Sequence, residues 1–275
     1  MKLSVLLLGA LLVAGCASEG VEGHGEGDGW VDPTAAPPLH TGLIEVSNSR
    51  FVPGVLHASA FFDEASRGDS CVRKVVASCL VRRCPADWNF VPARAVSAGT
   101  ITLSGSRAAP QQLVPAEGGA RYSFAEWQPG EFGLTEVVTV QAAGAEVPAF
   151  TGQVAILSGS FNQHEDEPNF HFDIDRNADL ALAWRPVNGV GGHVRVYVSQ
   201  ATEQEDLLVE CELPLAGGRG SLPRAALREL WPSGGAVVAT TLWMRAENVT
   251  RVRAGDYAID LVSRVALDGG DADVR

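Results

Sequence analysis

The apolar residues from Gly42 onward are distributed as in a β protein. Short runs rich in Val, Ile, Leu, Thr and Phe are separated by clusters of Gly, Pro, Asn and Ser. The clearest run is His193–Ser199, in which every second side chain is apolar. Such alternation is typical of a strand with one face on a core and the other in water. The pattern predicts antiparallel sheets, because strands this short with a turn signal about every ten residues do not suit a βαβ fold.

The predicted strands form two series separated by a polar break at 159–168. The first series comprises 43–47, 55–63, 72–77, 79–84, 100–104, 135–142 and 153–157, and the second comprises 170–174, 180–184, 193–199, 207–213, 236–246 and 257–266. Only 222–230 has apolar residues at helical spacing, with Pro223 suited to a first turn. The sequence therefore predicts an all-β protein with two tandem antiparallel β-sandwich domains, immunoglobulin-like, at 41–158 and 169–267. The second contains one short helix, and a disordered tail follows at 268–275.

The N-terminus has the pattern of an export signal. Met1-Lys2 and a leucine-rich run precede Val13-Ala14-Gly15-Cys16, which resembles the lipobox of bacterial lipoproteins. Residues 1–15 are then a signal peptide, and Cys16 becomes the lipid-bearing, palmitoylated first residue. The apolar run is shorter than the roughly 20 residues that span a membrane, so it does not predict a retained transmembrane helix. An ordinary secretory signal with a chance cysteine is the alternative.

The segment 16–40 is rich in Gly, Pro and acidic residues and poor in large apolar ones. Such a composition cannot bury enough surface to offset the entropy of ordering, so it predicts a disordered tether. The whole chain has 21 Lys and Arg against 33 Asp and Glu, a net charge of −12. This balance excludes nucleic acid as an expected partner, because nucleic-acid affinity comes from cationic side chains on phosphates. An acidic surface is also poorly suited to anionic lipid, so we expect membrane association to come from the lipid anchor.

Four further cysteines predict two disulfides in an oxidising compartment: Cys71, Cys79, Cys84 and Cys211. A zinc site is the competing interpretation, although the spacing has no CxxC knuckle. If the chain forms a hairpin that turns at Ala77-Ser78, Cys71 lies opposite Cys84 at a separation suited to a disulfide. Cys79 and Cys211 are then left either to link the two domains or to remain buried free thiols.

A weak calcium motif follows the polar break. Oxygen-bearing side chains occupy alternate positions: Asp173, Asp175, Asn177 and Asp179. Calcium needs several hard oxygen ligands, and this spacing resembles that of a calcium loop. However, Ala178 replaces the usual glycine and Trp184 replaces the closing carboxylate. The alternative is the solvated face of a strand.

Two tryptophans are candidates for binding. Trp127 and Trp231 lie beside Pro and Gly in expected loops, where an aromatic ring can stack on a sugar or anchor a partner. Trp184 and Trp243 lie within strand patterns and are expected in the core. Motifs for catalysis do not occur: Pro168 interrupts an HExxH arrangement, and there is no GxSxG, phosphate loop or dinucleotide motif. We therefore expect no enzyme, although a triad assembled from distant residues stays open.

Several segments carry a family resemblance: Ser97–Gly105, Ala142–Phe150, Asp179–Trp184, Cys211 and Gly220–Leu227. They resemble a group of lipoproteins common in gliding soil bacteria, which have two successive β-sandwich domains behind a lipobox and a tether. The resemblance implies a fold and a location but brings no activity. Ala17 follows the anchor cysteine where inner-membrane lipoproteins have aspartate, which implies the outer membrane.

These features together predict a lipid-anchored protein of the cell envelope that acts as a non-enzymatic binding or display module. Its expected partner is an envelope protein or a glycan, and no cofactor is required. The first alternative is a calcium-dependent or carbohydrate-binding adhesin. The second is an envelope hydrolase with a dispersed site.

Overall fold

The computed structural model describes residues 29–31, 40–48, 55–64, 71–86, 94–105, 107, 109–116, 121–123, 125–128, 131, 136–157, 171–184 and 191–275. The strands are β1 (Gly29–Val31), β2 (His40–Asn48), β3 (Leu56–Asp63), β4 (Val72–Val76), β5 (Cys79–Pro85), β6 (Ile101–Ser104), β7 (Gln111–Leu113), β8 (Ala125–Trp127), β9 (Val137–Ala142), β10 (Phe150–Ala155), β11 (His171–Ile174), β12 (Leu180–Ala183), β13 (His193–Thr202), β14 (Glu205–Pro214), β15 (Arg219–Leu222), β16 (Val237–Ala254) and β17 (Tyr257–Val274). One helix, α1, spans Arg224–Leu227. The fold is thus almost entirely β, as the apolar alternation predicts.

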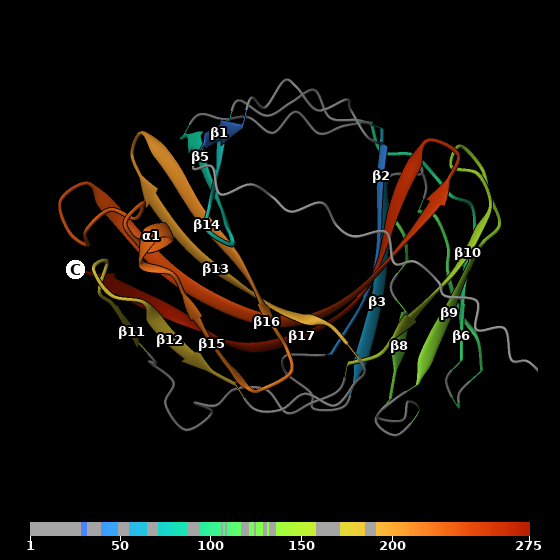
Figure 1. Ribbon diagram of the computed structural model, residues 1–275. Coiled ribbons are helices and arrows are strands. Elements are labelled where there is room, and N and C mark those ends of the chain that lie inside the picture. The colour runs from blue at the N-terminus through green and yellow to red at the C-terminus, as the bar shows by residue number, and fades with distance from the viewer. Residues whose placement is uncertain are drawn as a thin grey trace, which may run out of the picture.

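An 11-stranded sheet organises the molecule. Its order is β1-β4-β5-β14-β13-β16-β17-β2-β3-β8, and β11 also pairs with β17. The partners β2 and β11 run parallel to β17, and the other neighbours are antiparallel. The 18-residue strands β16 and β17 curve through the middle of the molecule, so the sheet has a concave and a convex side (Figure 1).

Two hydrophobic cores lie on the convex side. The first lobe packs β2, β3, β8 and one end of β16–β17 against the four-stranded sheet β10-β9-β6-β7. The second lobe packs β5, β13, β14 and the other end of β16–β17 against β11, the β12–β15 pair and α1. Alternate residues of β17 serve both cores, with Ile259 and Leu261 in the first and Val265 in the second. The period of two in a strand therefore assigns one face of this long element to burial.

Polar contacts occupy the junction between the cores. Asn248 and Ser263 are paired neighbours on β16 and β17. The Asn248 amide donates to the carbonyl of Ala155 at 3.1 Å, and the Leu157 backbone N–H donates to the Ser263 hydroxyl at 2.8 Å. These bonds fix the end of β10 where it crosses from the first core to the second. Buried polar groups require such partners.

The small sheet approaches the long one closely at Gly152. A Cβ atom there would lie 2.5 Å from Leu261 Cδ1 and 2.8 Å from Val252 Cγ1. Only glycine leaves room for this approach between β10 and the side chains of β16 and β17.

The sheet does not divide at the expected domain boundary. Strand β5 pairs with β14, and β2 pairs with β17, so β13, β14, β16 and β17 from 169–267 lie between strands from 41–158 in one sheet. Strand pairing over long separations is not encoded in local apolar patterns, and this explains the difference. The break at 159–168 itself lies outside the described residues.

The expectations for the chain ends are corrected in two places. Residues 268–274 form the last part of β17 and pair with β16 and β11, so they are not a disordered tail. Within the expected tether, Gly29–Val31 forms β1 and pairs with β4. The signal peptide 1–15, Cys16 and most of the remaining tether lie outside the described residues. No helix in the described part of the chain is long and apolar enough to cross a membrane.

Candidate functional site

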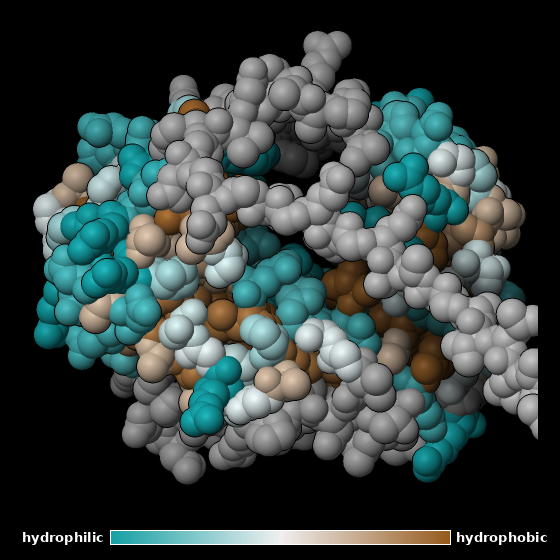
Figure 2. Space-filling view, viewed as in Figure 1, coloured by the Kyte–Doolittle hydropathy of each residue, from teal (hydrophilic) through white to brown (hydrophobic). Residues whose placement is uncertain are grey.

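The concave face of the long sheet carries an array of polar side chains that are joined by ion pairs. On β13 and β16 the residues that face away from the cores are mostly polar or aromatic: His193, Arg195, Tyr197, Ser199, Thr241, Trp243, Arg245 and Glu247. They alternate with core residues such as Val196 and Met244. Hydrophilic residues lie in the middle of the hollow, with hydrophobic residues on either side (Figure 2). The alternation therefore places charged side chains on the concave face of β13 and β16, while the other face of the same strands lines the second core.

Glu247 is the centre of this array, and its side chain is only 1% exposed. Its Oε1 atom lies 2.6 Å from Arg245 Nε and 2.8 Å from Arg264 Nε. Its Oε2 atom lies 3.4 Å from Arg195 Nη1 and 3.6 Å from His193 Nε2. One carboxylate thus joins β13, β16 and β17 through three guanidinium groups, as a buried charge requires.

The same arginines reach further carboxylates on the flanking strands. Arg195 pairs with Glu212 at 2.6 Å and with Glu210 at 3.2 Å, both on β14. Arg264 pairs with Glu45 on β2. We call this set of eight residues the ion-pair network: Glu45, His193, Arg195, Glu210, Glu212, Arg245, Glu247 and Arg264. It crosses five strands from β14 to β2, so it ties the two lobes together on the concave side.

The network shifts the titration of its members. Burial alone would raise the pKa of Glu247, but His193 and the surrounding guanidinium groups outweigh it and lower the pKa from 4.5 to about 2. Burial opposes the charge of Arg195, yet the negative charge of Glu247 leaves the pKa of Arg195 above its usual range. Both groups are therefore held in their charged forms at neutral pH.

Two aromatic side chains lie beside the network. Tyr197 and Trp243 are cross-strand neighbours, and the Arg245 guanidinium lies 4.2 Å from the centre of the Tyr197 ring. Arg245 also donates a hydrogen bond to the Tyr197 hydroxyl. Burial raises the pKa of Tyr197, so its hydroxyl stays protonated at neutral pH. Trp243 is 41% exposed, which corrects the expectation of a core residue.

A cavity of about 330 Å³ lies farther along the same face of β13 and β16, at Ser199 and Thr241. Its lining includes Arg82, Ser199, Asp206, Leu208 and Thr241. The hydroxyl oxygens of Ser199 and Thr241 lie 2.7 Å apart. The cavity therefore combines hydroxyl groups, one cation and one anion with an apolar wall. This volume is at the lower end of the range, about 300–1,000 Å³, that is usual for small-molecule sites.

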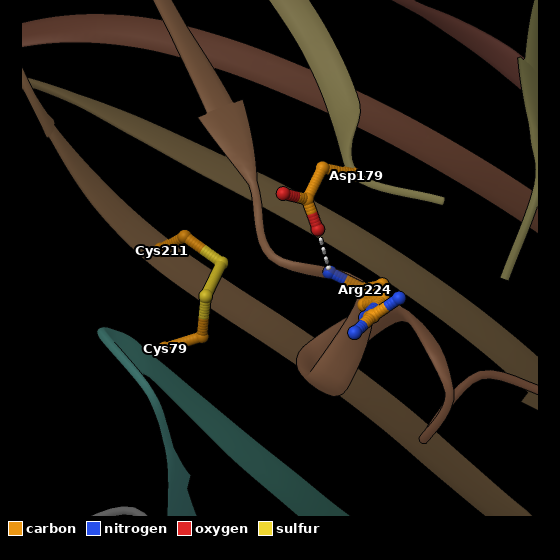
Figure 3. The surroundings of a disulfide bond; sticks show 4 residues. All are labelled: Cys79, Asp179, Cys211 and Arg224. Atoms are coloured by element: carbon orange, nitrogen blue, oxygen red, sulfur yellow. Dashed lines mark hydrogen bonds between the residues drawn. A yellow bond between two sulfur atoms is a disulfide. The ribbon is translucent and has the colours of Figure 1, made fainter. Parts of the chain in front are cut away.

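The structure contains both disulfides considered from the sequence, Cys71–Cys84 and Cys79–Cys211. Cys79 and Cys211 are paired neighbours on β5 and β14, within the second core. This bond therefore fastens the β4–β5 hairpin to β14 within one sheet. Figure 3 shows it near the start of α1. Cys84 lies on the opposite face of β5 and lines the cavity.

The weak calcium motif is not assembled, and its carboxylates have other partners. Asp173 accepts a hydrogen bond from Arg275, and Asp175 accepts one from the backbone N–H of Asn177. Asp179 accepts the backbone N–H of Arg224 at the start of α1 (Figure 3). Among the described residues, no group of three His, Cys, Asp or Glu side chains is placed to hold a metal ion. Asp179 instead caps the short helix, because Pro223 has no capping side chain.

The two tryptophans expected to bind differ in their surroundings. Trp127 ends β8 and is 1% exposed in the first core, so it is a packing residue and its assignment to a binding loop is corrected. Trp231 is half-buried and lines an open cavity of about 650 Å³ together with Glu205 and Ser233. The Gln200 side chain donates to the Trp231 carbonyl at 2.8 Å and accepts its backbone N–H at 2.7 Å. Trp231 therefore remains a candidate binding residue.

Sequence reasoning missed Trp243, although a signal was present. Leu242, Met244 and Ala246 belong to the second core, so the tryptophan between them falls on the polar face.

No protein-family model, curated protein or solved structure matches the chain.

Proposed function

We propose that the protein is a non-enzymatic binding module, attached through a lipid on Cys16 to the outer membrane of the cell envelope, whose recognition surface is the concave face of the long sheet. The lipobox-like segment Val13–Cys16 supports the location, as does the resemblance to envelope lipoproteins. We also propose that the two lobes correspond to two immunoglobulin-like sandwiches joined by the shared strands β16 and β17.

One observation carries the binding role: the concave face combines a fixed polar network with an aromatic side chain, Trp243, that is 41% exposed. Each arginine of the ion-pair network already faces at least one carboxylate. Side chains held in this way lose little further entropy when a ligand binds, and preorganisation of this kind favours affinity. The exposed Trp243 supplies contact area at the edge of the network.

Mass spectrometry of the mature protein tests the anchor. We expect loss of residues 1–15 and a lipid adduct on Cys16, and a Cys16→Ser variant should carry no lipid. A product that retains Met1 without lipid would contradict the proposed location.

Affinity capture from the native envelope tests the binding role. The lipidated protein should recover an envelope component, and Trp243→Ala should release it. Val137→Ala should not, because Val137 is equally exposed on the four-stranded sheet of the first lobe. Turnover of an envelope substrate that one side-chain change abolishes would instead indicate an enzyme.

A further inference from the structure

Arg82 on β5 differs from the arginines of the ion-pair network. Arg195, Arg245 and Arg264 each have a carboxylate partner. The Arg82 side chain makes no ion pair or hydrogen bond with the described residues. It is half-buried, and a charge in such a position is normally paired because its removal from water costs free energy.

The guanidinium group of Arg82 is held in place but keeps accessible donors. Its Nε atom is shielded from solvent without a hydrogen-bond partner, whereas Nη1 and Nη2 are not shielded in this way. The two terminal nitrogens are therefore the donors that a ligand can reach. Because the inner part of the side chain is enclosed, little further entropy is lost when these nitrogens bind.

Arg82 lines the cavity of about 330 Å³ on the concave face. Most of the lining belongs to two cross-strand rows of β5, β14, β13 and β16. The first row is Arg82, Leu208, Ser199 and Thr241, and the second is Cys84, Asp206, Ala201 and Ala239. The two alanines have short side chains, so the second row leaves space beside Ser199 and Thr241.

The far end of the first row supplies a second polar contact. Neighbouring strands are about 4.8 Å apart, so the Cα atoms of Arg82 and Ser199 are separated by about 10 Å, with Leu208 between them. The hydroxyl oxygens of Ser199 and Thr241 lie 2.7 Å apart, and one hydroxyl donates to the other. The accepting hydroxyl keeps its own O–H, which can donate to a ligand.

A small carboxylate fits this arrangement. The two terminal nitrogens of a guanidinium group can donate parallel hydrogen bonds to one carboxylate, and such charge-assisted pairs are strong. Leu208 then contacts an apolar body, and the hydroxyl pair contacts a polar group at its far end. Among the described lining residues Arg82 is the one cation and Asp206 adds a negative charge, so a single negative charge suits the cavity better than phosphate or a dicarboxylate.

We propose that this cavity is a binding site for small monocarboxylates with a short apolar body. Arg82 binds the carboxylate, Leu208 contacts the apolar body, and the Ser199–Thr241 pair bounds the far end. The site goes beyond the proposed envelope binding and does not depend on it, because Trp243, on which the capture test relies, is not part of the lining.

Calorimetry and ligand-observed NMR on the mature lipidated protein in a non-ionic detergent test the site. Butanoate and hexanoate are titrated beside succinate, inorganic phosphate and butanamide, the neutral analogue of butanoate. We expect a monocarboxylate to bind about tenfold or more tightly than the other three probes, because only it offers one negative charge to Arg82. Equal binding of butanoate and butanamide would overturn the proposal.

Substitutions in the cavity separate the charge from the space. Arg82→Gln should weaken binding by about tenfold or more, and Arg82→Lys should weaken it less because it keeps the charge. Ala239→Leu should also weaken binding, because the larger side chain of this exposed residue fills the cavity and leaves its charge unchanged. Arg253→Gln is the matched control: it removes the same charge near the far end of β16, outside the lining, and should leave binding unchanged.

Urea unfolding checks that each variant is folded before its binding is compared. Full binding by folded Arg82→Gln, or by folded Ala239→Leu, would overturn the site, as would the absence of binding by both monocarboxylates. If neither monocarboxylate binds but the envelope capture still depends on Trp243, only this site is overturned and the proposed binding module stands.

Discussion

The two faces of the long sheet are built from the same strands but have opposite chemistry. On β16, Leu242, Met244 and Ala246 enter the second core, while Trp243 and Arg245 between them line the concave hollow. The convex face packs against small sheets, whereas ion pairs hold the charged side chains of the concave face in place. The comparison indicates that packing stabilises one face and electrostatics order the other.

The two disulfides also differ between the faces, because one lies on each face of β5. Cys79–Cys211 closes 132 residues and Cys71–Cys84 closes 13. Chain entropy then predicts a loss of up to about 5 kcal/mol for Cys79→Ala with Cys211→Ala, against about 3 kcal/mol for the shorter loop. Urea unfolding of the two double variants measures the difference. A larger loss for Cys71→Ala with Cys84→Ala would contradict the expectation that Cys79–Cys211, in the second core, contributes more to stability.

Removal of the central carboxylate tests the concave face. Glu247→Ala leaves Arg195, Arg245 and Arg264 crowded around a vacated position, so we expect a loss of about 3–5 kcal/mol. Glu212→Ala is the control because Glu212 is 56% exposed, and it should cost at most about 1 kcal/mol. Equal effects in denaturant unfolding would argue against a central role for Glu247.

Phe61 and Phe62 provide a direct comparison of the two faces at neighbouring positions. Phe62 is 1% exposed in the first core and Phe61 is 44% exposed on the opposite face of β3. Phe62→Ala should therefore lower the free energy of unfolding by about 3–5 kcal/mol. Phe61→Ala should cost less than about 1 kcal/mol. A reversed order would show that the faces are misassigned.

Acid should affect the concave face through Glu247. The pKa of this carboxyl falls from 4.5 to about 2 on folding, so its contribution to stability is complete above pH 4.5 and is lost as pH falls toward 2. A shift of this size corresponds to about 3 kcal/mol. The free energy of unfolding should therefore fall less steeply between pH 6 and pH 2 for Glu247→Gln than for the unmodified protein. Identical pH profiles would contradict the lowered pKa.

The local elements could largely be predicted from the sequence. The strands near His193–Ser199 and the hairpin turn at Ala77-Ser78 follow from alternation and turn chemistry, and the Cys71–Cys84 pair follows from that hairpin. The arrangement of strands could not, because β4–β5 reaches β14 over more than a hundred residues. The candidate site was predictable only in part: alternation places Trp243 on a polar face, but the close approach of its ring to Gly269 depends on pairing with a separate strand.

The solvent accessibility of Trp243 in the purified protein and in the native envelope decides whether the concave face is a binding surface. Hydroxyl-radical footprinting read by mass spectrometry should modify Trp243 in the purified protein and protect it in intact envelopes. Val137 has the same exposed fraction of 41% away from the concave face, so its modification should be unchanged. Trp184, which is 3% exposed, should stay unmodified in both samples as a check on folding. Equal modification of Trp243 in both samples would contradict a binding surface on the concave face.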